Sequence, residues 1–298
     1  MAKNTADIAK LLEAIAGPDG LDDRQPSSIP EEQLAFSRLL SSFLTTAISS
    51  EKPLAGFRIG LLKEGFEVGV MNANIEDAVR SAARDLASLG AEVIEVSVPD
   101  HHALSNAWTC TLPLAGARDG LLGDRTGRKT LYMTDLATGP NHTITQEKFD
   151  SWSTSTKNLY LRYLYGAEKF GPVLHAKAAN LIRKYKQSYD AALGSLDAII
   201  MPTLPIPAPR SFLEHEEAGP LERMMRIAGI LHNTAPFDST GHPAITVPVG
   251  FVPAADDKAI KLPAGMQIVC KHFEDLTCLK IGAVWEKTKE WENLLYGF

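Results

Sequence analysis

The sequence has few cysteines and no apolar leader at its start. Of its 298 residues only Cys110, Cys270 and Cys278 are cysteines, and no two of them form a Cys-x-x-Cys pair. An odd number of cysteines without such a pair argues against a disulfide framework. The first residues carry no apolar stretch of the kind found in secretory signals. We therefore expect reduced thiols and a cytoplasmic protein.

Long apolar runs and an excess of positive charge are also absent. No apolar run approaches the ~18–20 residues that span a bilayer, so the sequence predicts no membrane partner. The formal net charge is -6 and no basic run stands out, which argues against nucleic-acid binding. A hydrophobic content of 45% with 22% charged residues is ordinary for a globular protein, and the chain is long enough to bury a sizeable core.

Short catalytic and metal-binding motifs are missing as well. There is no Gly-x-Ser-x-Gly elbow, no His-Glu-x-x-His pair and no phosphate-binding glycine loop. His101-His102 has no third ligand at a suitable spacing, and we interpret the pair as exposed loop residues. The Glu-His-Glu-Glu run at residues 214–217 is typical of a solvated loop. We therefore predict neither a metal nor a cofactor.

Strand and helix patterns alternate along the chain and predict an α/β protein. Residues 57–62 and 91–98 are apolar strands that flank a helix capped by Asn74, and such a unit is expected to be parallel and right-handed. Gly171-Pro172 separates two later helices, because proline fits the first turn of a helix but not its interior. The other expected elements are helices at residues 5–16, 31–49, 153–170, 173–193, 221–231 and 276–295, and strands at residues 198–201, 244–249 and 266–270.

The stretch from Asn233 to Gly250 combines an expected turn with an expected strand. It reads Asn-Thr-Ala-Pro-Phe-Asp-Ser-Thr-Gly-His-Pro-Ala-Ile-Thr-Val-Pro-Val-Gly. Pro248 cannot donate to a sheet ladder, so it is expected at a strand end, a bulge or an edge. Polar groups on a turn at a strand end are where α/β proteins tend to place ligand contacts. The same residues also suit a purely structural connection between a helix and a strand.

Three segments occur in the order in which the amidase signature family has them. They are residues 196–203 (Leu-Asp-Ala-Ile-Ile-Met-Pro-Thr), the stretch 233–250, and residues 262–269 (Leu-Pro-Ala-Gly-Met-Gln-Ile-Val) followed by Glu274-Asp275 and a terminal helix. Together they resemble the C-terminal part of that family, especially the amidases that accompany nitrile hydratases. The resemblance implies an α/β fold with a mixed sheet covered by helices on both faces. It also implies hydrolysis of a carboxamide to a carboxylic acid and ammonia through a serine acyl-enzyme, without a metal or an organic cofactor.

The family's catalytic residues have no counterpart in this sequence. The resemblance implies a Ser–cis-Ser–Lys triad on a Gly-Gly-Ser-Ser-Gly-Gly-Ser segment, and Gly-Gly-Ser occurs nowhere in the 298 residues. The opening residues Met1 to Asp7 look like the helix that follows this core in the family. We therefore interpret residues 1–298 as the C-terminal portion of a single amidase-like domain, incomplete at its N-terminal side. We name no catalytic residue and expect the chain alone to be inactive.

By the same resemblance, the chain supplies sheet strands, covering helices and one wall of the acyl pocket. Phe237, Thr240 and His242 are the candidates for that wall. Their alternative roles are core packing for Phe237, a turn hydrogen bond for Thr240 and a structural imidazole for His242. The implied partner is a small-molecule amide, if the missing core completes the site. The sequence is also compatible with a homo-oligomer.

The sequence leaves three functions open. The first is an amide hydrolase whose catalytic half is not in this sequence. The second is a catalytically inactive fragment, or a non-enzymatic interaction protein, that retains part of the fold. The third is a transamidase-type protein that acts on a charged tRNA, although the acidic net charge and the similarity to nitrile-pathway amidases count against it.

Overall fold

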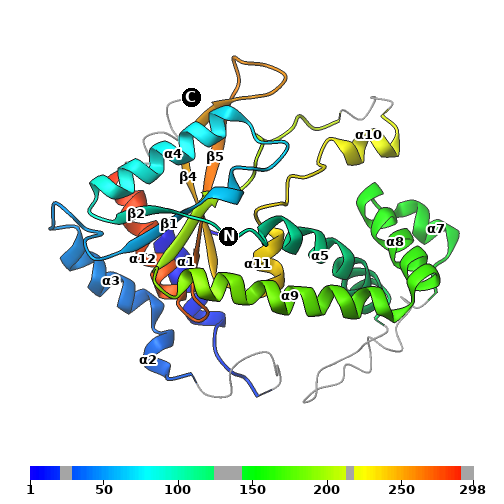
Figure 1. Cartoon of the computed structure of the whole chain (residues 1–298), viewed down its shortest axis with the longest axis horizontal. Helices are drawn as coiled ribbons and strands as arrows, with labels where there is room; N and C mark the ends of the chain where they lie inside the picture. Colours follow the sequence, from blue (N-terminus) through cyan, green and yellow to red (C-terminus); the bar gives the residue numbers. More distant parts are fainter. Residues whose placement is uncertain (21–28, 124–142, 213–217, 290–298) are drawn as a thin grey trace.

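The computed structural model describes residues 1–20, 29–123, 143–212 and 218–289 (Figure 1). In chain order its helices and strands are α1 (Thr5–Ile15), α2 (Glu31–Leu34), α3 (Phe36–Ala47), β1 (Arg58–Leu62), η1 (Lys63–Gly65), α4 (Ala73–Ser88), β2 (Glu92–Val96), α5 (His101–Pro113), η2 (Leu114–Leu121), α7 (Gln146–Ser151), α8 (Thr154–Phe170), α9 (Pro172–Leu193), β3 (Ala198–Pro202), α10 (Pro220–Met225), α11 (Ala235–Thr240), β4 (Ala244–Pro253), β5 (Lys261–Cys270) and α12 (Asp275–Thr288). The charge run at residues 214–217 lies outside the described residues.

In the described residues, five strands form one mixed sheet in the order β2-β1-β3-β5-β4. β1 pairs in parallel with both β2 and β3, whereas β5 pairs antiparallel with β3 and β4. α4 connects β1 to β2, so the predicted parallel strand–helix–strand unit is confirmed. The cap of α4 differs from the prediction: Asn72 caps the helix, because its side chain accepts a hydrogen bond from the backbone N–H of Asn74.

The middle and the edge of the sheet match their sequence patterns. β3 is central and all five of its residues are buried, as its continuous apolar run predicts. β4 is an edge strand, and its pairing with β5 shifts register between Pro248 and Gly250. The predicted place of Pro248, at a bulge or an edge, is therefore confirmed.

Helices cover both faces of the sheet (Figure 1). Successive strand residues point to opposite faces, and the core divides accordingly. Ile200 and Ile268 pack on the side of α4 and α12. Ile199 and Val269 pack on the other side, against residues of α5, α9 and α11. The predicted α/β fold, with a mixed sheet covered on both faces, is confirmed.

α1 and α3 form an outer layer against α12. The apolar residues buried in this layer are Ala9, Phe36, Leu40, Leu279 and Ala283. Both carboxylate oxygens of Glu286 in α12 accept from the backbone N–H of Thr5, at 2.9 and 3.0 Å. The first turn of α1 is therefore fixed by the last helix of the described chain.

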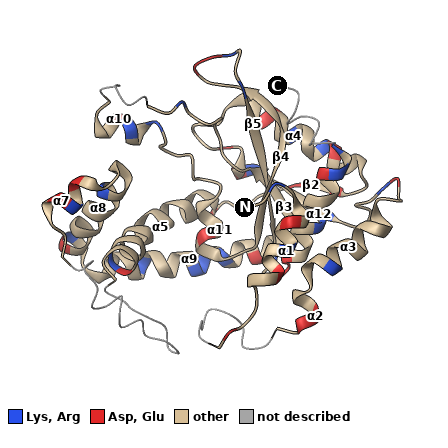
Figure 2. Cartoon of the chain, turned by 180° about the vertical axis from the view of Figure 1, so that it is seen from behind, with Lys and Arg blue, Asp and Glu red and all other residues tan. Residues whose placement is uncertain are grey.

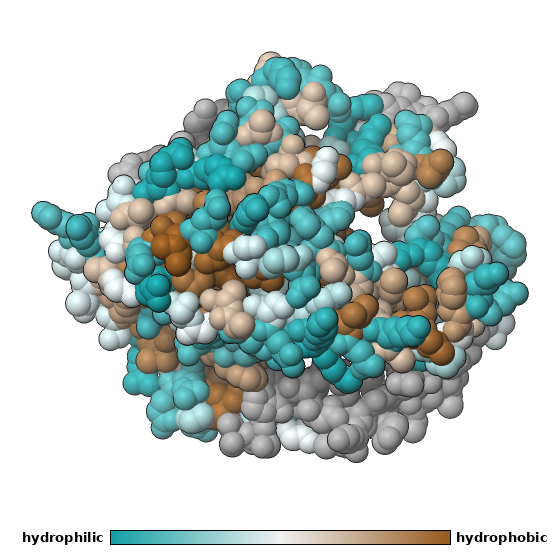
Figure 3. Space-filling view, viewed as in Figure 1, coloured by the Kyte–Doolittle hydropathy of each residue, from teal (hydrophilic) through white to brown (hydrophobic). Residues whose placement is uncertain are grey.

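The surface mixes charges and carries apolar side chains on two helices. Lys and Arg are interspersed with Asp and Glu over the helices drawn in Figure 2. In the part of the chain that the structure describes, no helix is long and apolar enough to cross a membrane. Exposed apolar side chains gather on α8 and α9, toward the right of Figure 3. They are Leu161, Leu164, Tyr165, Phe170, Val173 and Leu181.

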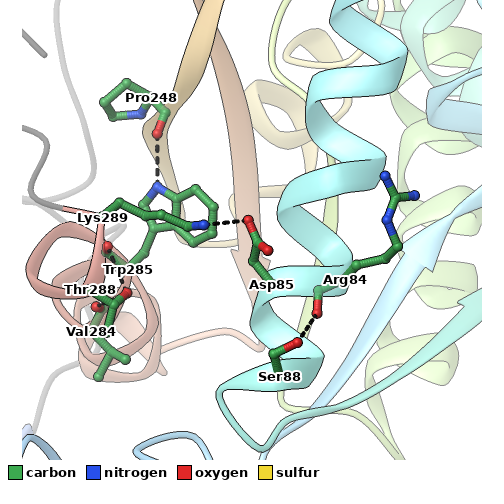
Figure 4. A network of polar contacts seen from close by, with 8 residues as sticks. All are labelled: Arg84, Asp85, Ser88, Pro248, Val284, Trp285, Thr288 and Lys289. Atoms are coloured by element: carbon green, nitrogen blue, oxygen red, sulfur yellow. Dashed lines mark hydrogen bonds and ion pairs between the residues drawn. The ribbon is translucent and has the colours of Figure 1, made fainter.

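Figure 4 shows how the end of α12 is held against β4 and α4. The indole N–H of Trp285 donates to the carbonyl oxygen of Pro248, with an N···O distance of 2.8 Å. Lys289, which directly follows α12, forms an ion pair with Asp85 of α4. The carbonyl of Pro248, a partly buried residue beside the β4 bulge, is thereby paired by a side chain.

The helix expected over residues 31–49 is divided in the structure. The chain forms α2 and α3, with a break at Ala35. The Glu13 carboxylate of α1 accepts a hydrogen bond of 2.7 Å from the backbone N–H of Ser37, in the first turn of α3. This bond is the main reason why the pKa of Glu13 is lowered. α3 is therefore capped from another helix, which local sequence does not reveal.

Three local predictions in the site region are wrong. The apolar run at residues 221–231 is helical only in α10, which ends at Met225. The expected turn at residues 236–241 is the short helix α11, with Pro236 in its first turn and Gly241 as its left-handed C-terminal cap at φ +75°. His101 and His102 belong to α5 rather than to a loop, and His101 is fully buried.

Candidate functional site

The carboxyl ends of β1, β2 and β3 carry a buried polar network. Glu64, in η1 directly after β1, accepts hydrogen bonds from the Ser97 hydroxyl and from the Val98 backbone N–H. Burial by itself raises the pKa of Glu64, but these hydrogen bonds outweigh burial and hold the pKa below its usual value. The ionised carboxylate therefore joins the ends of two neighbouring parallel strands.

Asn233 lies at the centre of this network. Its side-chain Nδ2 donates to the carbonyl oxygens of Gly65 (2.9 Å) and Pro202 (2.7 Å), which follow β1 and end β3. Its Oδ1 lies 2.9 Å from Nε2 of His101, and its backbone carbonyl accepts from the Gln267 side chain of β5. One asparagine thus ties together three strands of the sheet and α5.

The bonding of Asn233 fixes the proton positions on His101. Because Nδ2 of Asn233 donates twice, its Oδ1 is the acceptor, and Nε2 of His101 carries the proton. Nδ1 of His101 then accepts a hydrogen bond from the Tyr189 hydroxyl. Burial lowers the pKa of His101 to about 4 and raises the pKa of Tyr189. Both side chains are therefore neutral at pH 7.

The structure brings the three predicted pocket residues together, on α11 and in the turn before β4. The ring of Phe237 packs edge-on against Tyr189, with 5.1 Å between the ring centroids. The Thr240 hydroxyl lies 2.8 Å from Nδ1 of His242. Each of the three residues is at most 6% exposed. Their packing and hydrogen-bonding roles are visible here, while their place in an acyl pocket stays a prediction.

His242 also contacts a carboxylate and a second histidine. Its Nε2 lies 3.1 Å from Oδ1 of Asp190 in α9. Nε2 of His272, in the turn after β5, lies 4.0 Å from the same oxygen, and the two imidazole centroids are 4.1 Å apart. Burial lowers the pKa of both histidines, to about 4 for His242. The three ligand atoms lie within 4.8 Å of one another.

A separate groove of about 540 Å³ lies between α5, η2, α8 and α9. Its walls are largely apolar, with Leu114, Tyr163 and Phe170 among them, and they include Arg118 and Arg162. The residues that line this groove do not include the three predicted pocket residues. The groove is therefore separate from the region that contains Phe237, Thr240 and His242.

Sequence reasoning did not select Glu64, Asn233 or Asp190 as site residues. The partners in each contact are far apart in sequence: 33 positions for Glu64 and Ser97, 168 for Asn233 and Gly65, and 52 for Asp190 and His242. No short motif can contain such pairs. Only Glu64 has a positional signal: it follows the parallel strand β1, and polar residues that follow parallel strands gather at one edge of a sheet.

Comparison with known proteins shows relatives over almost the whole chain. The model of the family described as Amidase matches residues 1–279. The enantioselective amidase of Rhodococcus rhodochrous is 32% identical over 287 residues, which cover 95% of this chain and 51% of that protein. A glutamyl-tRNA(Gln) amidotransferase protein of Ralstonia nicotianae is 29% identical over 298 residues, which cover 98% of this chain and 56% of that protein.

A solved structure supports the fold, and the lengths of the relatives bear on the extent of the chain. The 6-aminohexanoate cyclic dimer hydrolase superposes with a TM-score of 0.68 at 20% identity, over 97% of this chain and 54% of that one. The chain spans about half the length of the curated relatives it matches. Its interpretation as a C-terminal portion without the catalytic core stays a prediction. From the extent of the family match, the chain belongs to the amidase family.

Proposed function

We propose that this chain is part of an amidase that converts a carboxamide to a carboxylic acid and ammonia through a serine acyl-enzyme. The observation that carries the proposal is the family match over residues 1–279, together with 32% identity to an enantioselective amidase. In this reaction a serine oxygen attacks the amide carbonyl and ammonia leaves. Water then releases the carboxylic acid from the acyl-enzyme.

In this proposal the chain supplies the scaffold and a pocket wall, and not the nucleophile. The sequence has no Gly-Gly-Ser segment onto which a Ser–cis-Ser–Lys triad maps. His101 does not suit the role of general base, because Tyr189 and Asn233 engage both of its ring nitrogens. Its network instead holds the carboxyl ends of the strands in place. Phe237 and Thr240 are proposed to face the acyl group.

The test compares the 298-residue chain alone with a chimera. The chimera takes from the Rhodococcus rhodochrous amidase the part that has no match in this chain. The 298-residue chain is fused to the C-terminal end of that part. Ammonia release from acetamide, propionamide and benzamide is followed for both proteins. We expect the chain alone to stay at background and the chimera to turn over at least one amide. If the chain alone hydrolyses an amide after rigorous removal of host amidases, the prediction that it lacks catalytic residues is wrong.

A non-enzymatic interaction protein that retains the fold is the second candidate function. The exposed apolar side chains of α8 and α9 favour it, because such surfaces mark contacts with other proteins. A chimera that folds, shown by a cooperative thermal melt, yet hydrolyses none of the three amides supports this candidate over the first. The transamidase alternative is disfavoured by the net charge of -6.

A further inference from the structure

We propose that Asp190, His242 and His272 form a binding site for a divalent transition-metal ion of the Zn²⁺ class. The three residues come from α9, from the turn before β4 and from the turn after β5. They form no spaced motif, so the sequence alone predicts no metal here. The proposal is independent of amide hydrolysis, and metal binding can be measured without it.

The donor atoms are already close to the arrangement that such an ion requires. Oδ1 of Asp190 is 3.1 Å from Nε2 of His242 and 4.0 Å from Nε2 of His272. All three atoms lie within 4.8 Å of one another. Zn²⁺ with bonds of ~2.0–2.2 Å in tetrahedral geometry places its ligand atoms about 3.4 Å apart. Closing the site therefore changes the separations between donor atoms by at most about 1.4 Å and also turns the two stacked imidazole rings toward a common point.

The environment of the His272 imidazole gives a second, independent observation. Its Nε2 atom is shielded from solvent, yet among the described residues it has no hydrogen-bond partner. A buried polar nitrogen without a partner costs free energy, which a metal–nitrogen bond recovers. The side chain of Asp190 is 46% exposed, so an ion can reach the three donors from solvent.

Thr240 completes the site by supporting His242. When Nε2 of His242 binds a metal, its Nδ1 carries the proton and must donate it. The Thr240 hydroxyl lies 2.8 Å from that atom. A hydroxyl can donate or accept, so Thr240 suits both the metal-free tautomer, in which Nε2–H faces Asp190, and the metal-bound one.

The donor set determines which ions fit. Two imidazoles and one carboxylate favour Zn²⁺, Co²⁺ and related ions over Ca²⁺ and Mg²⁺, which prefer oxygen ligands. The charges around the site are mixed. The Lys186 ammonium, one turn before Asp190, lowers the pKa of both histidines and opposes a cation. Asp275, at the start of α12, has a negative charge that acts on His272 and favours a cation.

The experiment uses the full chain without an affinity tag, treated with a chelator and then freed of it. Cys110→Ser is the background, because Cys110 is partly exposed and its thiol can compete for metal. Zn²⁺ is titrated by calorimetry at pH 7.5, and Co²⁺ by the visible absorption that reports tetrahedral coordination. We expect one equivalent of either ion to saturate the protein, and Ca²⁺ to give no saturable binding.

Four variants test the assignment of ligands. Asp190→Asn and His272→Asn are expected to abolish saturable binding at the concentrations that saturate the parent. Thr240→Val is expected to weaken binding by about 10–100-fold, as removal of a supporting hydrogen bond does. His232→Asn, which changes a histidine outside the cluster, is the matched control and is expected to bind as the parent does.

Circular dichroism and thermal melts without metal show that each variant is folded before binding is measured. Asp190 and His272 are chosen because both are partly exposed, so their replacement perturbs the core less than a change at His242. No saturable binding of Zn²⁺ or Co²⁺ to the folded parent overturns the proposal. Equal binding by the parent and by folded Asp190→Asn and His272→Asn also overturns it.

Discussion

Single titratable side chains at the strand ends differ in charge according to their surroundings. Glu64 is ionised because Ser97 and Val98 donate hydrogen bonds to it, which outweighs the effect of its burial. His101 is neutral because burial disfavours the imidazolium form. Both side chains hold strand ends together, so protonation of either one is coupled to the stability of the fold.

We expect the free energy of unfolding to fall as the pH drops from about 6.5 to about 4, in part through His101. Its pKa is 6.5 when unperturbed and about 4 in the folded chain. In that window the unfolded chain binds a proton that the folded chain does not. The contribution of neutral His101, about 3 kcal/mol, is fully present above pH 6.5 and is lost as the pH falls to 4. Urea unfolding at half-unit steps of pH measures it.

The variant His101→Gln isolates this contribution. Without the imidazole, the free energy of unfolding should depend less on pH between 6.5 and 4. His102→Gln is the matched control, because His102 lies in the same helix and is only partly buried. Glu64, His102 and His232 are the neighbours whose charges act on His101. An equal pH dependence in the parent and in His101→Gln would contradict the assignment.

Phe237 tests the proposed pocket wall, and the chimera described above is the protein to use. If the side chain faces the acyl group, Phe237→Ala should change the preference between acetamide and benzamide. One methylene of pocket contact changes discrimination by ~1–3 kcal/mol, so loss of an aromatic ring should be visible in the ratio of kcat/KM values. If the variant keeps the substrate ratio of its parent and only its stability falls, Phe237 is a packing residue against Tyr189.

At the scale of helices and strands, elements defined by their own residues were predictable. The apolar run of β3 and the break at Gly171-Pro172 are of this kind. Boundaries that depend on distant partners were not predictable from the sequence. The first turn of α3 is an example, because the Ser37 backbone N–H donates a hydrogen bond to Glu13, 24 positions away. The same holds for the candidate site. His101 meets Tyr189 and Asn233 across 88 and 132 positions, and only the assembled sheet brings them together.

The contact between α12 and β4 should depend on one hydrogen bond more than on the neighbouring ion pair. Trp285→Phe removes the indole donor to the Pro248 carbonyl, and the free energy of unfolding should fall by about 1–3 kcal/mol because a partly buried hydrogen bond is lost. Lys289→Ala breaks a partly exposed ion pair with Asp85 and should cost less than about 1 kcal/mol. Denaturant unfolding of both variants gives the comparison. A larger loss in Lys289→Ala would refute this ranking.

At the scale of the whole molecule, we expect the isolated chain to self-associate through α8 and α9. Their exposed apolar side chains include Leu161 and Val173, each more than half exposed. The double variant Leu161→Lys, Val173→Lys should elute later from a sizing column and bind less apolar dye than the parent. Ile260→Lys changes a side chain of similar exposure on another surface and is the matched control. A parent that is a monodisperse monomer and binds little dye would argue against this surface.

The bond between Thr5 and Glu286 has a consequence for how the protein is made. The two residues are 281 positions apart, and a ribosome that adds ~5–20 residues per second needs roughly 15 to 60 seconds to cover that distance. During this time α1 has emerged without the helix that fixes its first turn, and the apolar surface that α1 and α3 bury against α12 is open to other chains. The yield of folded protein should therefore depend on translation speed and on chaperones that shield α1 and α3 until α12 arrives.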